Sequence, residues 1–314
     1  MAIAFVFPGQ GSQAVGMMRS LAARHPLIER TFAEAAGVLH YDLWKICTEG
    51  PADALNETEC TQPAMLTAAI ATYRLWRDLG GPQPKLMAGH SLGEFSALVA
   101  AGSLDFKTAV DLVRFRAQAM QSAVPQGEGA MAAILGLEDS DVEAACAEAA
   151  QGEVVEAVNF NAPGQVVIAG NAAAVARAIA AASARGAKRA VPLPISVPAH
   201  SSLMRSAALR FGERLAATTV AAPAGVAVYG VDVRTHTHPE EIRAGLVKQL
   251  HTPVYWAATV RTMIAAGASL IVECGPGKVL TSLNRRIDKN REINTAALED
   301  PKDLDAALQS AIGA

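Results

Sequence analysis

Short apolar runs that end at glycine or proline alternate with segments of helical period along the first 125 residues. Residues 2–7 form a wholly apolar run before Pro8-Gly9, and residues 85–89 form a second short run. Such runs are typical of strands that are buried on both faces, as in a parallel sheet. The helical patterns cover residues 17–24, 27–38, 63–79, 91–101 and 105–123. This alternation predicts an α/β fold with a mostly parallel sheet.

The pattern changes near residue 125 and becomes more compact. The expected elements are strand 130–135, helix 140–150, strand 154–159, turn 161–164, strand 165–169, helix 172–184 and strand 187–191. Read in order, this is the β-α-β-β-α-β motif of ferredoxin-like domains. We therefore predict a small domain at 126–195, inserted into a larger domain made of residues 1–125 and 196–314.

Composition excludes several classes of protein. The chain has 314 residues, of which 51% are hydrophobic and 18% charged, so it has ample apolar surface to fold. Lys and Arg number 27 against 30 Asp and Glu, a net charge of −3, which argues against a general nucleic-acid binder. Residues 1–18 carry no charge, but Pro8, Gly9 and Gly11 interrupt them. We expect neither a signal peptide nor a membrane span there.

The cysteines point to a reducing compartment. None of the four forms a C-x-x-C pair, and nothing in their spacing suggests a disulfide framework. They are Cys47, Cys60, Cys146 and Cys274. We therefore expect a cytoplasmic protein.

Residues 89–93 read Gly-His-Ser-Leu-Gly and match the G-x-S-x-G pattern of a nucleophile elbow. A predicted strand precedes the motif and a predicted helix follows it, which is the context that the motif requires. The flanking glycines permit a sharp turn that exposes the Ser91 hydroxyl. The N–H of Leu92 then lies at a helix start, where it can donate to an oxyanion. An ordinary glycine-rich turn is the alternative.

A serine nucleophile needs a base, and His200 is the best candidate among the seven histidines. It follows Pro198, where an extended segment gives way to a helical pattern, and it lies after Ser91 as in α/β-hydrolases. A surface or capping histidine is the alternative. His90 adjoins Ser91, but neighbouring side chains on a tight turn usually diverge. No Asp or Glu between Ser91 and His200 occupies a convincing position for a triad acid, so a backbone carbonyl can orient the histidine instead.

Two further segments carry residues that are typical of ligand binding. The loop at residues 8–13 has glycines and free amides, but it lacks the lysine of a P-loop and does not fit G-x-G-x-x-G. We predict that it supplies an oxyanion donor. His236 and His238 have no third ligand at useful spacing, so we predict no metal site.

Six motifs occur in a familiar order, and together they are more specific than the elbow alone. They are Phe7-Pro-Gly-Gln-Gly-Ser-Gln13, Gly89-His-Ser-Leu-Gly-Glu94, Arg116 within Val113-Arg-Phe-Arg-Ala117, Asn159-Phe-Asn-Ala-Pro-Gly-Gln165, Val197-Pro-Ala-His200 and Glu273-Cys-Gly-Pro-Gly-Lys278. From about residue 3 to residue 290 the chain resembles the malonyl-CoA:acyl-carrier-protein transacylases, discrete enzymes of bacterial type II fatty acid synthesis. The resemblance implies an α/β-hydrolase-like large domain and a ferredoxin-like small domain.

The resemblance also implies roles for individual residues. Malonyl-CoA would acylate Ser91 with His200 as base, and the malonyl group would pass to the phosphopantetheine thiol of acyl carrier protein in a ping-pong scheme. The backbone N–H groups of Gln10 and Leu92 match the oxyanion hole. Gln249 matches the residue whose main-chain carbonyl orients the histidine. No cofactor or metal is implied.

Arg116 matches the family's arginine for the malonyl carboxylate, which a guanidinium can hold through two parallel charge-assisted bonds. On the helix pattern alone, an arginine here is more typical of a solvated surface. Ala199 stands where malonyl-selective domains of polyketide synthases often carry Phe. The discrete enzymes commonly have a small residue there, so malonyl stays the expected group and tolerance for a bulkier one stays open. Met120, on the same predicted helix as Arg116, is expected in the pocket wall or the core.

Partners and competing functions complete the expectations. Basic groups at residues 185–189 and 285–291 are candidate docking patches for an acidic carrier protein and for CoA phosphates, although either can be a solvated helix face. A monomer is the default. A serine hydrolase, either thioesterase or esterase, could use the same Ser91 and His200, but it has no use for Arg116. A catalytically inert binding module is the third possibility, which the intact Ser91 and His200 argue against.

Overall fold

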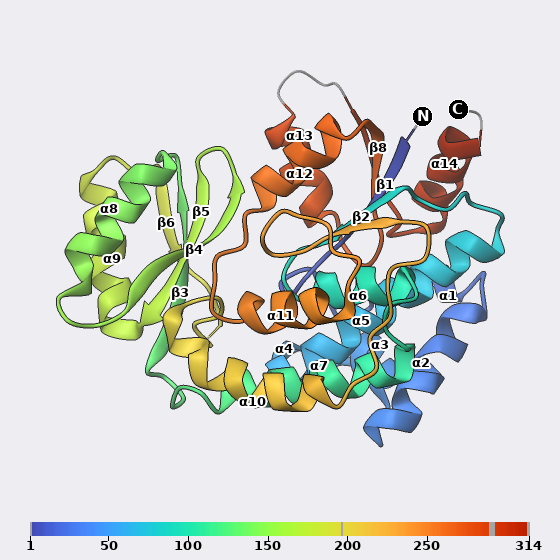
Figure 1. Ribbon diagram of the computed structural model, residues 1–314, viewed down its shortest axis with the longest axis horizontal. Coiled ribbons are helices and arrows are strands. Elements are labelled where there is room, and N and C mark those ends of the chain that lie inside the picture. The colour runs from blue at the N-terminus through green and yellow to red at the C-terminus, as the bar shows by residue number, and fades with distance from the viewer. Residues whose placement is uncertain (1, 196, 289–292, 313–314) are drawn as a thin grey trace.

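The computed structural model describes residues 2–195, 197–288 and 293–312 (Figure 1). The described strands form two separate sheets. All neighbours in the first sheet are parallel. Its strand order is β7 (Ala227–Tyr229), β2 (Leu86–Gly89), β1 (Ala2–Phe7), β8 (Ala268–Glu273) and β9 (Asn294–Ala297). The apolar runs at residues 2–7 and 85–89 are thus central strands of a parallel sheet, as their composition predicts.

Alternate residues of β1 enter two different cores on the two faces of this sheet. Phe5 and Phe7 join the larger core, while Ala4 and Val6 join the smaller one. The larger core is built with helices α1 (Arg19–Ala22), α2 (Leu27–Leu39), α3 (Leu43–Glu49), α4 (Ala52–Asn56), α5 (Thr58–Asp78), α6 (Gly93–Ala100), α7 (Phe106–Gln121), α10 (Arg205–Ala216), α11 (Pro239–Gln249) and α14 (Pro301–Ile312). The smaller core is built with α12 (Trp256–Ala265) and α13 (Val279–Ile287). Because helices cover both faces of the sheet, the central strands β1 and β2 are apolar at every position instead of alternating with polar residues.

The second sheet, at the left of Figure 1, is antiparallel and has the strand order β4-β5-β3-β6. Its elements in chain order are β3 (Gly129–Leu135), α8 (Asp139–Ala150), β4 (Val155–Ala162), β5 (Gln165–Asn171), α9 (Ala172–Ala184) and β6 (Arg189–Pro192). This is the β-α-β-β-α-β motif, so the predicted fold class is confirmed. All these elements lie inside residues 126–195, whereas the exact domain limits stay a prediction.

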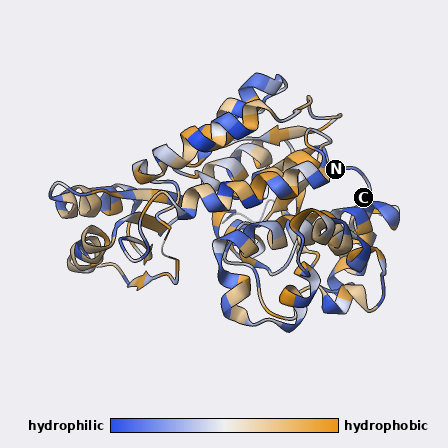
Figure 2. Ribbon diagram, turned by 90° about the horizontal axis from the view of Figure 1, so that it is seen from below, coloured by the Kyte–Doolittle hydropathy of each residue, from blue (hydrophilic) through white to orange (hydrophobic). Residues whose placement is uncertain are grey.

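The two faces of the second sheet have different neighbours. One face packs on α8 and α9 through residues such as Ile134, Val166 and Ile168. The other face presents Met131 and Val167 toward the segment that returns to the first sheet. Figure 2 shows hydrophilic and hydrophobic residues alternating along the helices of both parts, as expected where a helix packs by one face.

Strand β4 joins the two parts of the molecule. The Phe160 N–H donates to the Val254 carbonyl at 2.9 Å, and the Val254 N–H donates to the Val158 carbonyl at 2.8 Å. The Phe160 and Tyr255 rings stack with centroids 5.1 Å apart. These contacts hold the second sheet beside the body, which we define as the first sheet with the helices of its two cores.

Several predicted boundaries were wrong. Helix α5 starts five residues before the predicted start at Pro63, which lies inside the helix. The short helices α3 and α4 were not predicted, because fewer than two turns carry little periodic signal. The predicted turn at 161–164 is also too long, since Asn161 and Ala162 belong to β4. The register of β4 with β5 shifts between Phe160 and Ala162. This shift accommodates Asn161 in the strand, although asparagine is typical of turns.

Candidate active site

The turn between β2 and α6 places Ser91 in a conformation that few side chains adopt. Its φ is +53°, in the left-handed region. A Cβ on Gly89 would lie 1.8 Å from the Gly93 carbonyl carbon, and one on Gly93 would lie 2.0 Å from the Phe7 oxygen. Both glycines are therefore required by space, and the elbow predicted from the spacing is present.

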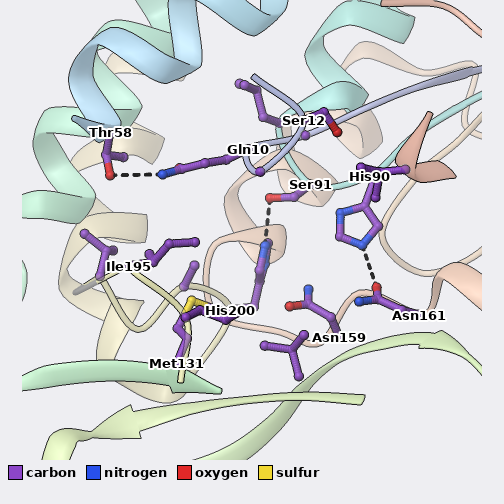
Figure 3. Close-up of a pocket in the computed structure, with 18 of the residues that line it drawn as sticks. Gln10, Ser12, Thr58, His90, Ser91, Met131, Asn159, Asn161, Ile195 and His200 are labelled. Carbon is purple, nitrogen blue, oxygen red and sulfur yellow. Dashed lines mark hydrogen bonds between the residues drawn. The ribbon is translucent and has the colours of Figure 1, made fainter. Parts of the chain in front are cut away.

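His200 lies within hydrogen-bonding distance of the Ser91 hydroxyl, with Ser91 Oγ and His200 Nε2 2.7 Å apart (Figure 3). The other ring nitrogen, Nδ1, lies 2.7 Å from the Gln249 carbonyl oxygen. A carbonyl only accepts, so Nδ1 carries the proton and Nε2 is free to accept from Ser91. The structure thus brings together Ser91, His200 and the main chain of Gln249, as the resemblance implies.

The environment of His200 keeps the ring neutral. Burial lowers the pKa of His200 to about 3, and the nearby positive charge of Arg116 acts in the same direction. The bond to the Gln249 carbonyl opposes them, because it favours the protonated ring. A neutral imidazole at physiological pH is the form that a general base needs.

Arg116 is 1% exposed and is directed at the nucleophile, although its helix pattern alone favoured a solvated arginine. Its Nη1 donates to Gln62 Oε1 and its Nη2 to Gln249 Oε1, both at 2.9 Å. The same Nη2 lies 3.4 Å from Ser91 Oγ. Burial lowers the pKa of Arg116 to about 10, so the group stays cationic at neutral pH. A buried cation held by neutral amides beside a nucleophile can bind an anion.

The predicted oxyanion donors also lie at the site. Gln10 and Leu92 both line the cavity around Ser91. Within the described residues, neither backbone N–H has a hydrogen-bond acceptor in the protein. A Cβ on Gly9 would lie 2.5 Å from the His90 oxygen, so the loop of Gln10 runs directly against the elbow. Both N–H groups are thus available as donors at the cavity, which is what the predicted oxyanion hole requires.

A cavity of about 520 Å³ opens above Ser91, between the body and the second sheet. Its volume lies in the range of small-molecule sites. Lining residues from the body include Ser12, Thr58, Gln62, Met120 and Ala199, and those from the second sheet include Met131, Asn159, Asn161 and Val167. Figure 3 shows Ser12 and Thr58 on one side of the Ser91–His200 pair and Met131, Asn159 and Asn161 on the other. Met120 is thus part of the pocket wall.

Comparison with known proteins agrees with this geometry. The family model described as "Acyl transferase domain" matches residues 4–300. The chain belongs to this acyl transferase family. It is 54% identical over 306 residues to a protein of Escherichia coli named malonyl CoA-acyl carrier protein transacylase, covering 98% of both chains. A Bacillus subtilis protein of the same name is 42% identical over 309 residues, covering 98% of this chain and 96% of the relative.

Solved structures give the same result. An acyl carrier protein S-malonyltransferase from Vibrio cholerae is 52% identical, with a TM-score of 0.94 over 98% of this chain and all of the other. A malonyl-transacylase solved in complex with a type II PKS acyl-carrier protein is 49% identical, with a TM-score of 0.97 over 99% of this chain and all of the other. The two-part fold is therefore that of acyl transferases with established structures.

The site of this acyl transferase contains polar groups to which the sequence assigns no role. His90 points toward Asn161, and its Nε2 lies 2.8 Å from Asn161 Oδ1 (Figure 3). Burial lowers the pKa of His90, which favours the neutral ring. The bond to Asn161 connects the elbow to the second sheet. Glu94 is buried in the first turn of α6, where Gln249 Nε2 donates to its carboxylate at 2.5 Å. The only sequence signal for Glu94 was its place directly after the elbow motif.

Other candidates lie away from the site. The four cysteines are free and buried. His236 lies 3.0 Å from Asp232 and 3.4 Å from Glu241. Within residues 2–195, 197–288 and 293–312, no group of three or more His, Cys, Asp or Glu could hold a metal ion. None of the described helices is both long and apolar enough to cross a membrane.

The two basic groups are only partly available for docking. Arg185 pairs with Glu148 at 2.7 Å. Lys188 and Arg189 are exposed. Arg286 donates to Gln165 and the Pro163 carbonyl, so this arginine links α13 to the turn between β4 and β5. Lys289 and Arg291 lie outside the described residues.

Proposed function

We propose that this acyl transferase moves a malonyl group from malonyl-CoA to the phosphopantetheine thiol of an acyl carrier protein through a malonyl-Ser91 intermediate. The observation that carries the proposal is the buried Arg116 guanidinium, 3.4 Å from Ser91 Oγ. A malonyl group on Ser91 carries a free carboxylate a few bonds from the ester, within reach of this cation. A serine hydrolase of neutral acyl groups gains nothing from such a buried charge.

In the first half-reaction, Ser91 Oγ attacks the thioester carbonyl carbon while His200 Nε2 takes the hydroxyl proton. The Gln10 and Leu92 N–H groups stabilise the oxyanion of the tetrahedral intermediate. The intermediate collapses as the carbon–sulfur bond breaks, and the CoA sulfur leaves with the proton from His200. In the second half-reaction, the carrier thiol gives its proton to His200 and attacks the malonyl ester, and the proton returns to Ser91.

Substrate binding increases the basicity of His200. Arg116 lowers the pKa of His200 in the free enzyme. A malonyl carboxylate on Arg116 opposes that positive charge, so the imidazole becomes a stronger base only when an acidic acyl group is in place. The same arginine thus links the choice of acyl group to the reactivity of the nucleophile.

The carrier protein is proposed to dock through exposed basic side chains at residues 185–189 and on α13. All five side chains are exposed. Arg185 pairs with Glu148, Arg286 donates to Gln165, and Arg285 donates through Nε to Thr295 Oγ1 at 2.9 Å. Such patches act mainly on the association rate with an acidic partner. Charge reversal of Lys188 with Arg189, or of Arg285, is expected to raise the KM for carrier protein at low salt. An unchanged KM would refute docking here.

We further propose a monomeric, cytoplasmic enzyme without a cofactor, and the free cysteines support a reducing compartment.

The test is peptide mapping after incubation with malonyl-CoA. The proposal predicts one malonyl adduct, located on Ser91, and no adduct on Ser91→Ala. The substitution keeps a Cβ at the same backbone position, so the strained turn is unchanged and the melting temperature serves as the folding control. An adduct elsewhere, or none, would refute the proposal.

A further inference from the structure

The Glu94 side chain lies behind the nucleophile, and among the described residues its carboxylate has one hydrogen-bond partner, Gln249. Glu94 is 5% exposed, and its carboxylate accepts from Gln249 Nε2 at 2.5 Å. The same Nε2 donates to the Ser91 carbonyl at 3.0 Å. On the other side of the amide, Gln249 Oε1 accepts from Arg116 Nη2 at 2.9 Å. One side-chain amide therefore connects a buried carboxylate to a buried guanidinium.

These partners allow only one orientation of the amide. In the observed orientation, both Nε2 contacts are with acceptors and the Oε1 contact is with a donor. A flipped amide would place its oxygen against a carboxylate and a carbonyl, and its nitrogen against a guanidinium. The charge on Glu94 makes the flip most costly, because charge-assisted bonds are about twice as strong as neutral ones. Glu94 thus fixes the acceptor that Arg116 uses.

Gln249 has two functions in one residue. Its main-chain carbonyl orients His200, while its side chain holds Arg116.

The charged groups facing Glu94 are Arg116 from α7 and, from the segment after β7, Asp232 and His236. Burial raises the pKa of Glu94 to about 7, against the opposing effects of Gln249 and Arg116. Its charge therefore changes close to neutral pH.

We propose that Glu94 is a positioning residue for acyl selection, holding Arg116 through the Gln249 amide so that the guanidinium meets a carboxylated acyl group on Ser91. This inference rests on the proposed function. Glu94 touches neither the acyl group nor the reacting atoms. When the Glu94 charge is lost, Arg116 stays in the site but the Gln249 amide can rotate away from it. The value of kcat/KM should therefore fall more for malonyl-CoA than for acetyl-CoA.

The experiment measures kcat/KM for malonyl-CoA and for acetyl-CoA, with the ratio of the two as the readout. Glu94→Gln keeps the shape of the side chain and removes the charge. We expect this ratio to fall about tenfold, the size of one charge-assisted hydrogen bond. In the Arg116→Ala background the same substitution should leave the ratio unchanged, because the group on which Glu94 acts is gone. An equal fall in both backgrounds, or no fall in either, would overturn the proposal.

Glu273→Gln is the matched control. Glu273 is also buried and accepts from the Thr281 and Leu280 N–H groups at 2.7 and 3.0 Å, and it has no bond to Gln249 or Arg116. This substitution should lower the melting temperature without changing the malonyl-to-acetyl ratio. A ratio that falls as much as in Glu94→Gln would show a structural effect and refute positioning.

The wild-type enzyme gives an independent readout. The malonyl-to-acetyl ratio of the wild type should fall as the pH is lowered from about 8 to about 6, because Glu94 takes up a proton. In Glu94→Gln the ratio should be constant over this range. His236 is present in both proteins, so a pH dependence that persists in the variant would contradict the role of Glu94. If wild-type Ser91 is never malonylated, the proposed function fails. If Arg116→Ala loses malonyl preference but Glu94→Gln keeps it, only this inference fails.

Discussion

The body wall of the cavity carries Ser91, His200 and Arg116, whereas the sheet wall carries Met131, Val167 and the amides of Asn159 and Asn161. On the body wall, hydrogen bonds of 2.5 to 3.4 Å run from Glu94 through Gln249 and Arg116 to Ser91. The sheet wall offers apolar area and neutral amides. Under the proposed function, the reaction and the choice of acyl group belong to the body wall, and the sheet wall shapes the cavity.

The largest expected contrast comes from removing Arg116 on the body wall. Arg116→Ala should lower kcat/KM for malonyl-CoA by roughly 10²- to 10³-fold, the loss of two charge-assisted bonds, and that for acetyl-CoA far less. The measurement is initial rates with both thioesters. Arg114→Ala is the matched control on the same helix, since Arg114 is partly exposed and pairs with Asp111. Equal losses for malonyl and acetyl would deny the carboxylate role.

The next contrast concerns pH, because buried titratable groups lie on the body wall. The folded-state pKa of Glu94 is raised from its ordinary value of 4.5 to about 7 by burial. A raised pKa contributes stability that is complete below about pH 4.5 and is lost as the pH rises through about 7. Between about pH 4.5 and about pH 7, the free energy of unfolding of the wild type should therefore fall by about 3 kcal/mol relative to that of Glu94→Gln. Urea unfolding of both proteins at several pH values measures the difference, and parallel pH profiles would contradict it.

The smallest contrast lies on the sheet wall. Asn161→Ala removes the partner of the buried His90 Nε2, which should cost about 1 to 2 kcal/mol of stability. The malonyl-to-acetyl ratio should stay within about twofold, because Asn161 has no bond to Arg116. Denaturant unfolding and the two thioester rates give both quantities. A large change in the ratio would show that acyl choice is shared between the walls.

The elements that could be predicted are those whose signal is local. The bounds of β1 and of α9 follow directly from an apolar run and an alanine-rich helical pattern. The elbow follows from its two glycines. A side chain at either position would clash, so the requirement for glycine leaves a fixed spacing in the sequence. The candidate residues Ser91, His200, Arg116, Gln10 and Leu92 line the cavity, and Gln249 bonds to His200 and Arg116. Their roles stay proposals.

The remaining features depend on packing between distant segments. The Gln249 carbonyl meets His200 across 49 positions of the chain, and a main-chain acceptor leaves no residue-specific signal. Arg116 is buried because Phe95, Gln62 and Gln249 surround its guanidinium, which a helical period alone does not reveal. Asn161 reads as a turn residue, and only the shifted register of β4 with β5 places it in a strand.

The most direct test of the account follows the fate of the acyl group. The enzyme is malonylated, separated from CoA, and divided between buffer and phosphopantetheine-loaded acyl carrier protein, and intact mass is recorded for every chain. The account predicts that the adduct persists in buffer and moves to the carrier thiol when carrier protein is added. Loss of the adduct to water at the same rate in both samples, with no malonyl on the carrier protein, would contradict it.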